Sequence, residues 1–466
     1  MISWGITSGS HDGAIAVFEN NNLIFATDAE RFSRVKNDKE ISDKLINFVT
    51  KKWGKPDKIY FYENPELKAE RRFFSGQEKS IKIKKPLISK IKEPIYVEHH
   101  LSHAAYGYYT SYFDECLILV IDAIGEWDTL TLWYVNSELN FKKLKNWKYP
   151  KSLGLLYSAC TQSAGWKPNE EEYIMMGASS VYEKDDNLVG YLENLWNENF
   201  NFHQGVDLSF IDKKSIPASV QFLYEKIFSE IIEEVIRHDL YNGNLIFCGG
   251  CALNVKANRF LSKIDNVYIP CNPGDGGSSV GCVLYHTKNK IDPTPYLGYD
   301  ISGNYPIDQI IQNLLNDSII GVAKGKAEFG PRALGNRSIF ADPRVKNVKD
   351  LLNEIKGRES FRPFGAMILK EDVDEWYIDH GVNSPYMNSI FYAKDKTIEA
   401  FAPLVHDDKS TRLQIIDNEH NLRELLMKWR SITNCPMIIN TSLNIKGMPL
   451  VNDEDDVKKF KNVNVL

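Results

Sequence analysis

The stretch CLILVIDAIGEWD, from Cys116 to Asp128, decides the class of fold that the sequence predicts. Its apolar run is typical of a buried strand, carries Asp122 near its end and passes into a glycine-containing polar turn. Two later stretches, NLIFCGGCALNVKANRFL (244–261) and NVYIPCNPGDGGSSVGCVLYH (266–286), follow the same pattern of strand, turn and helix. Such turns expose backbone N–H groups that bind phosphates. We therefore predict an α/β protein with a nucleotide in a cleft at the strand ends.

Other elements can be placed around these stretches. ISWGITSG (2–9) and GAIAVFEN (13–20) read as two strands of a hairpin with a turn at ENNNL. Apolar residues at helical spacing predict a helix over 218–237, with Pro217 in its first turn. The proline-, glycine- and tyrosine-rich run 290–306 reads as a linker, so we place a domain boundary near residue 300.

Composition sets broader limits on function. A chain of 466 residues should form two or three domains, and its net charge of −6 gives no general attraction to nucleic acid or membranes. The N-terminus does not read as a signal peptide, and an odd count of seven cysteines favours a reducing cytoplasm. Cys248 and Cys251 form a CxxC, which we interpret as a strand end and glycine turn rather than a zinc or redox site.

Histidines are concentrated in HHLSHAAYGYY, which begins at His99. On a helix, His99 and His103 share one face, while His100 points elsewhere. The pattern is not the zinc-protease HExxH, because no glutamate lies between the two ligands. Asp122 and Asp275 lie at strand ends, and two histidines with two aspartates suit Fe(II), Mn(II) or another divalent ion. The alternative is a hydrogen-bonded HxxxH pair with an aspartate that caps a turn.

Longer strings resemble a known family. EFGPRALGNRSIFADPR (328–344), IKGRESFRPFGAMIL (355–369) and INTSLNIKGMPLV (439–451) closely resemble the carbamoyltransferases, which include nodulation-factor and antibiotic O-carbamoyltransferases such as tobramycin carbamoyltransferase. SHDGAIAVFENNNLIFATDAERFSRVKND (10–38) looks like the family's opening. The motifs HHLSHAAYGYY, DAIGEW, GGCALN and NPGDGGSS follow in the family's order, so the resemblance covers nearly the whole chain.

The resemblance implies two domains and two half-reactions. Residues 1–300 would form an ASKHA-type metal- and nucleotide-binding domain, and residues 301–466 a YrdC-like α/β domain. Carbamoyl phosphate and ATP would give carbamoyl-adenylate and pyrophosphate in the second domain. The carbamoyl group would then pass to an acceptor hydroxyl at the metal site of the first. Fe(II) is the metal we expect first, with Mn(II) or Mg(II) as alternatives.

The resemblance also implies roles for individual residues. His11 matches a histidine near the transferred carbamoyl group, and Asp12 follows it. The matched metal ligands are His99, His103, Asp122 and Asp275. The nucleotide-binding turn would contain Gly249, Gly250 and Asn254. The pocket for carbamoyl phosphate and ATP would contain Arg332, Lys356, Arg362, Arg412 and Ser442, with Lys356 and Arg362 also expected in catalysis. The chain departs from the family at Ile174, where a lysine is usual, but keeps Gly177.

The proposed chemistry explains why the second region is rich in cations. Carbamoyl phosphate and ATP bring several negative charges together, and arginine and lysine offset the repulsion. The cationic side chains are interleaved with Phe361, Pro363 and Phe364, which favours a binding site over a solvated face; they are Arg332, Arg337, Lys356, Arg358 and Arg362. Ser442 and Asn444 follow an apolar strand, where a turn can hold an anion.

The acceptor is left open by the sequence. A small-molecule hydroxyl, as in a sugar or antibiotic, is the first expectation. The alternative is a 5-hydroxymethyl pyrimidine in DNA or a nucleotide, with stacking by Tyr106, Tyr108 and Tyr109. Its phosphate backbone would follow the lysines Lys79, Lys82, Lys84, Lys85, Lys90 and Lys92. A third interpretation is a non-catalytic nucleotide-dependent partner protein. We expect no membrane contact, and the sequence gives no signal for an oligomeric state.

Overall fold

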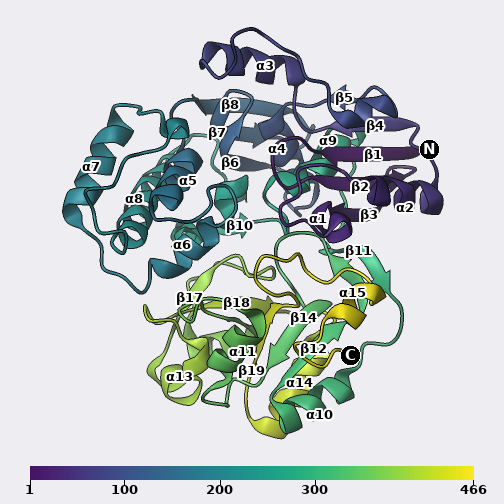
Figure 1. The fold of residues 1–466 in the computed structure, drawn as a ribbon, viewed down its shortest axis with the longest axis vertical. Coiled ribbons are helices and arrows are strands. Elements are labelled where there is room, and N and C mark those ends of the chain that lie inside the picture. The colour runs from purple at the N-terminus through teal and green to yellow at the C-terminus, as the bar shows by residue number, and fades with distance from the viewer. The chain divides into compact units, whose positions relative to one another are not determined.

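The computed structural model describes residues 1–466 and divides the chain into two compact units (Figure 1). The first unit comprises Met1–Met175, Lys184–Leu253 and Lys263–Thr294. The second comprises Met176–Glu183, Asn254–Ser262 and Pro295–Leu466. The main change of unit, at Pro295, lies close to the composition shift near residue 300. The two short segments of the second unit were not expected from the sequence.

The first unit contains two five-stranded sheets with the same strand order. The first runs β3-β2-β1-β4-β5 and consists of β1 (Ile2–Thr7), β2 (Ala14–Glu19), β3 (Asn22–Asp28), β4 (Lys58–Phe61) and β5 (Ile95–Tyr96). The second runs β8-β7-β6-β9-β10 and consists of β6 (Cys116–Gly125), β7 (Asp128–Val135), β8 (Phe141–Lys148), β9 (Asn244–Cys248) and β10 (Asn266–Tyr268). In each sheet, three consecutive antiparallel strands are extended by two parallel ones. This repeated topology confirms the ASKHA-type fold.

Two local predictions are corrected by these sheets. β1 and β2 do pair in an antiparallel manner, but the ENNNL turn joins β2 to a third strand, β3. The stretch after Cys116 leads into β7 and not into a helix. The reason is that the residues of β7, DTLTLWYV, are rich in threonine, aromatic and branched side chains, which favour a strand.

Two helices connect the sheets of the first unit. α9 (Asp275–Thr287) packs on β1 and β2, α4 (His99–Tyr109) packs on β6 and β9, and the two helices pack against each other. Their contact is close, since a Cβ atom at Gly281 would lie 1.9 Å from the carbonyl oxygen of Ser102. Because α4 begins at His99 and α9 begins at Asp275, the packing brings two polar helix starts together.

The remaining helices of the first unit flank this layered centre (Figure 1). The helix predicted over 218–237 is confirmed as α8 (Ile216–Ile236). The others are α1 (Glu30–Ser33), α2 (Asp43–Trp53), α3 (Pro65–Phe74), α5 (Leu153–Ser163), α7 (Asp186–Asn197) and α6 (Glu172–Ala178), whose last residues belong to the second unit. None of the helices combines the length and the apolar character that a bilayer crossing requires. All seven cysteines are buried and unpaired.

The second unit is built on a mixed seven-stranded sheet with the order β12-β14-β19-β15-β18-β17-β16. Its strands are β12 (Ile319–Ala323), β14 (Arg337–Ala341), β15 (Gly365–Leu369), β16 (Tyr377–Ile378), β17 (Ile390–Ala393), β18 (Ser410–Ile416) and β19 (Met437–Ser442). Its helices include α10 (Ile307–Asp317), α11 (Val348–Lys356), α13 (Asp395–Ala400), α14 (Arg423–Thr433) and α15 (Glu454–Lys459). The α/β class is confirmed. Part of the predicted linker is a strand, β11 (Tyr296–Ile301), which pairs with β13 (Gly325–Glu328).

Asp408 binds the two short segments of the second unit, Met176–Glu183 and Asn254–Ser262. Its carboxylate accepts hydrogen bonds from Ser180 Oγ at 2.6 Å and Ser410 Oγ at 2.6 Å, and lies 2.9 Å from Lys256 Nζ. Ser180 and Lys256 belong to the two short segments. One carboxylate therefore joins three stretches of the unit that are far apart in the sequence.

Candidate active site

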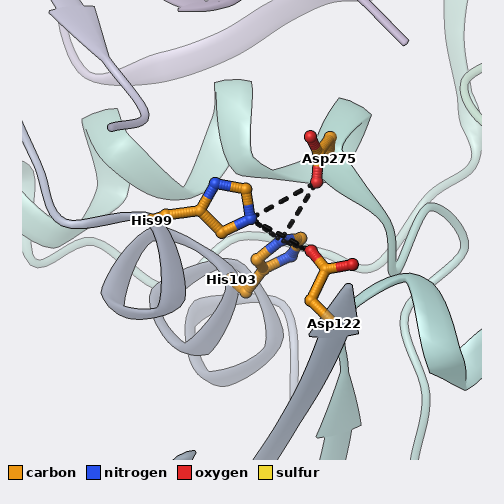
Figure 2. A group of neighbouring side chains, drawn as sticks. All are labelled: His99, His103, Asp122 and Asp275. Atoms are coloured by element: carbon orange, nitrogen blue, oxygen red, sulfur yellow. Dashed lines mark hydrogen bonds and ion pairs between the residues drawn. The ribbon is translucent and has the colours of Figure 1, made fainter. Parts of the chain in front are cut away.

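Four side chains converge at the centre of the first unit. Figure 2 shows His99 and His103 from α4, Asp122 from β6 and Asp275 from α9 pointing toward one another. His99 Nε2 lies 3.0 Å from Asp122 Oδ2 and 3.4 Å from Asp275 Oδ1. His103 Nε2 lies 3.3 and 3.4 Å from the same two atoms. One possible ligand atom from each residue lies within 4.8 Å of all the others.

This geometry fits a divalent cation. Ligand atoms about 2.0–2.2 Å from a shared ion stand roughly 3–4.3 Å apart, as these nitrogen and oxygen atoms do. Asp275 Oδ1 is buried and accepts no hydrogen bond, although a buried carboxylate oxygen is costly without a partner. Two imidazoles with two carboxylates make the mixed nitrogen and oxygen set that suits Fe(II) or Mn(II) more than a structural zinc.

The charges of the four groups offset one another. Burial alone would raise the pKa of the Asp122 carboxyl, but the two histidines hold it well below its usual range. Burial alone would lower the pKa of His99, but Asp275 and Asp122 raise it well above its usual value. Without a cation, protons on the imidazoles therefore compensate the carboxylates. A divalent cation has to displace these protons, so its binding releases them.

His11 lies beside this group. Its Nε2 is 3.9 Å from Asp275 Oδ2, and its Nδ1 is 3.2 Å from Asp12 Oδ2. The side chain is 35% exposed, which leaves room for a substrate atom. Burial alone would lower the pKa of His11, but the attraction of Asp275 and the hydrogen bond with Asp12 raise it to about 10.

Glu126 supports the group and was not singled out from the sequence. Its two carboxylate oxygens both accept from the backbone N–H of His99 at 3.1 Å, and Oε1 also accepts from Asn64 N at 2.7 Å. Burial raises the pKa of this carboxyl to about 7, although the two N–H donors oppose the shift. The carboxylate therefore caps the helix that carries both histidines. A glutamate directly after the strand-ending Gly125 was the available signal.

The residues predicted to form the nucleotide-binding turn belong to different units, since Gly249 and Gly250 lie in the first and Asn254 in the second. Gly249, with φ of +91°, packs so closely on the end of β6 that its Cβ would lie 2.2 Å from the carbonyl oxygen of Ile121. Gly250 faces Asp122. Asn254 begins a segment of the second unit, and its Oδ1 accepts from Ala257 N at 3.1 Å. Cys248 ends β9 and Cys251 lies in the short helix Gly250–Leu253, so the CxxC spans a strand end and a glycine turn as interpreted, and burial raises the pKa of both thiols.

The second unit contains a cluster of like charges, here called the cation cluster. It consists of Arg332, Lys356, Arg358, Arg362 and Arg412. Burial, strengthened by the neighbouring Arg362, lowers the pKa of Arg332 to about 10. The pKa of Arg412 is also lowered, by burial and then by Arg332, Arg358 and Arg362, and its Nε has no hydrogen-bond partner. Glu359 pairs with Arg362 at 3.6 Å. Cations this close, with so few carboxylates, favour an anion.

Lys356 joins the cluster to the turn after β19. Its Nζ donates to Ser442 Oγ at 3.2 Å and to Asn444 Oδ1 at 2.9 Å, and it also binds the Ser442 carbonyl. Burial, and then Arg358 and Arg362, hold the pKa of this lysine well below its usual value. Lys356 and Ser442, predicted from separate motifs, are thus direct neighbours.

Two interpretations of the sequence are contradicted by the positions of the side chains. Arg337 is fully buried and donates to backbone carbonyls, including Asn452 O at 3.0 Å, so it is a core residue and no part of the cation cluster. Tyr106, Tyr108 and Tyr109 are at most 3% exposed, so they cannot stack on an extruded base. Ile174, which replaces the family's lysine, is also buried.

Comparison with known proteins identifies the family. The model described as Carbamoyltransferase N-terminus matches residues 67–284, and the one described as Carbamoyltransferase C-terminus matches residues 311–465. The chain belongs to the carbamoyltransferase family. It is therefore a transferase of the carbamoyl group by family.

Relatives match this carbamoyltransferase along most of its length. An uncharacterized protein of Methanocaldococcus jannaschii is 30% identical over 98% of this chain and 96% of its own. Nodulation protein NolNO of Sinorhizobium fredii is 27% identical over 96% of this chain and 76% of its own. Among solved structures, HypF of T. kodakarensis matches 62% of this chain and 48% of its own, with 11% identity and a TM-score of 0.37.

Proposed function

We propose that this carbamoyltransferase is ATP-dependent and transfers the carbamoyl group to a hydroxyl of a small molecule. The observation that carries the proposal is the cation cluster, a partly buried group of like charges that only an anionic ligand would relieve. Carbamoyl phosphate and ATP are such ligands. The carboxylate-rich group around His99 suits the opposite task, since it favours a cation and a neutral reacting carbonyl.

The first half-reaction would take place at the cation cluster. Water releases phosphate from carbamoyl phosphate, and an oxygen of the resulting carbamate bonds to the α-phosphorus of ATP. Pyrophosphate leaves with the electron pair of the broken P–O bond, which gives carbamoyl-adenylate. Arg332, Arg362 and Arg412 would bind the phosphate oxygens, and Lys356 with Ser442 would hold the reacting end.

The second half-reaction would take place beside His11. The acceptor oxygen bonds to the carbamoyl carbon, AMP leaves with the electron pair, and the acceptor's proton passes to a base. Without a bound cation, the pKa of His11 of about 10 favours an imidazolium that donates to the carbamoyl oxygen. A divalent cation held by His99, His103, Asp122 and Asp275 would polarise the carbonyl and, by offsetting the aspartates, lower that pKa so that His11 accepts the proton.

The first half-reaction is the one to test. Purified chain would be mixed with ATP, carbamoyl phosphate and Fe(II) or Mn(II) without acceptor, and pyrophosphate and phosphate release would be followed together. We expect equimolar release that Lys356→Ala lowers by at least about 100-fold and that Lys370→Ala, at an exposed lysine of the same unit, leaves unchanged. Release that is equal in both variants would contradict the assignment of the cation cluster.

A further inference from the structure

The segment from Phe73 to Ile95, here called the basic apolar segment, exposes an unusual number of large apolar side chains. Of the 21 large apolar residues that are exposed in the chain, seven lie within these 23 of 466 residues. Phe74, at 69%, is among the most exposed of all. The seven are Phe73, Phe74, Ile81, Ile83, Leu87, Ile91 and Ile95. Such a concentration marks an interaction surface.

The same segment is strongly basic. It carries six lysines and two glutamates, a net charge of +4 in a chain whose total is −6, so the rest of the chain carries −10. Lys84 pairs with Glu78 at 3.2 Å and Lys85 with Glu93 at 2.9 Å. The other lysines have no ion pair; they are Lys79, Lys82, Lys90 and Lys92. The partner should therefore be negatively charged.

The segment is fixed to the first unit and is not a free tail. Ile88, in the short helix Leu87–Lys90, is only 4% exposed and anchors its middle. Arg71 NH1 donates to Gln77 Oε1 at 3.1 Å at its beginning. The backbone of the segment is therefore anchored at these two points, while its aliphatic and basic side chains are exposed to solvent.

We propose that the basic apolar segment binds the surface of an anionic lipid bilayer. Isoleucine, leucine and phenylalanine side chains would enter the boundary between headgroups and acyl chains, while the lysines meet lipid phosphates. A nucleic acid offers phosphates and stacking bases but no apolar environment for five exposed aliphatic side chains. The proposal departs from the sequence expectation of no membrane contact, which rested on the net charge of the whole chain.

The segment is also continuous with the candidate active site through α3. Lys68 of α3 donates to Ser10 Oγ at 2.8 Å, directly before His11, and Asn64 at the start of α3 is held by Glu126. A bilayer bound at the end of this helix would lie on the element that contacts the loop of His11. The proposal itself does not depend on the carbamoyl acceptor.

Vesicle co-sedimentation of the full chain tests the proposal. We expect the chain to sediment with vesicles of equal parts phosphatidylcholine and phosphatidylglycerol, to stay in solution with phosphatidylcholine alone, and to detach as salt is raised. Replacing Lys82, Lys90 and Lys92 together by glutamine should weaken binding by about 100-fold, from about fivefold for each lysine. The matched control removes the same charge at exposed lysines of the second unit, through K458Q, K459Q and K461Q.

A second pair of variants separates the apolar contribution. Phe74→Ser with Ile83→Ser should weaken binding at unchanged charge, whereas Phe210→Ser, which removes a phenylalanine that is 63% exposed elsewhere, should not. The proposal is overturned if the chain ignores anionic vesicles at low salt, or if the control variants lose binding equally. It is also overturned if a single-stranded oligonucleotide binds the segment and vesicles do not.

Discussion

The first unit contains His99, His103, Asp122 and Asp275, here called the His/Asp group, and the second contains the cation cluster. The two groups differ in how their charges are balanced. In the first, two imidazoles and two carboxylates lie 3.0–3.4 Å apart and shift each other's pKa values toward the charged forms. In the second, burial and then the neighbouring arginines lower the pKa values of Arg332, Lys356 and Arg412, away from the charged forms. One group compensates its own charge, and the other does not.

The difference teaches how each group depends on its ligand. The His/Asp group can exchange protons for a divalent cation and stay compensated in either state. The cation cluster keeps its repulsion until an anion arrives, so the anion should stabilise the second unit by mass action. Loss of a ligand residue should therefore damage binding in both groups, but it should damage folding only in the first.

The largest effect is expected at Asp122. Asp122→Asn removes one of the two negative charges that hold the imidazoles, so divalent metal affinity should fall by more than the roughly 10–100-fold typical of changing a group that only supports a ligand. Metal content after dialysis and calorimetric titration with Mn(II) would measure it.

A histidine of the same helix supplies the control for that experiment. His100 contacts Thr131 Oγ1 at 3.0 Å and not the aspartates, so His100→Gln should keep the metal affinity. Unchanged affinity in Asp122→Asn would show that Asp122 is not a ligand.

A smaller effect is expected at Arg412. Arg412→Gln should weaken phosphate or carbamoyl phosphate binding by about 10–100-fold, because a charge-assisted hydrogen bond contributes about 1.5–3 kcal/mol. The free energy of unfolding without ligand should stay constant or rise, since like-charge repulsion is relieved. Thermal unfolding with and without phosphate checks both parts, and a large loss of stability in the ligand-free variant would contradict the comparison.

The second unit also contains a cation whose charge is compensated, since Lys256 forms an ion pair with Asp408. Burial would raise the pKa of Asp408, but Lys256 and Ser180 hold it well below its usual range. The pair's stabilisation is therefore present above the unfolded pKa of about 3.9 and lost as pH falls below it. Asp408→Asn should cost about 2 kcal/mol at pH 7, less than a fully buried pair because the carboxylate is partly exposed.

Denaturant unfolding at several pH values measures this effect. The difference between wild type and Asp408→Asn should shrink below about pH 4. Asp407→Asn, at the exposed neighbouring carboxylate, should change little at any pH. A difference that stays constant down to pH 3 would rule out the ion pair as its source.

The smallest effect is expected at Glu328, which holds the loop of Arg332. Its Oε1 accepts from the backbone N–H groups of Leu334, Asn336 and Arg337 at 2.7, 2.9 and 3.2 Å, while Oε2 is buried without a hydrogen bond. Glu328→Gln keeps one acceptor oxygen, so we expect KM for carbamoyl phosphate to rise about fivefold, equivalent to about 1 kcal/mol, with kcat little changed. A change in kcat alone would point to a different role.

The sequence by itself determined what depends on local geometry. The spacing of His99 and His103 follows from the helical repeat, which also turns His100 away. The apolar pattern fixed α8, and the long strings such as EFGPRALGNR carried the family. These features need only neighbours along the chain, so the order of residues is enough to read them.

Only the tertiary structure decided what depends on distant partners. Asp122 and Asp275 meet the histidines because α4 and α9 pack between two sheets, and Glu126 reaches the N–H of His99 for the same reason. Arg337 looks like its neighbours in the sequence but lies among backbone carbonyls, whereas Arg412 stays in the cation cluster. Burial and long-range contacts distinguish a core arginine from a binding-site arginine, and the local sequence pattern predicts neither.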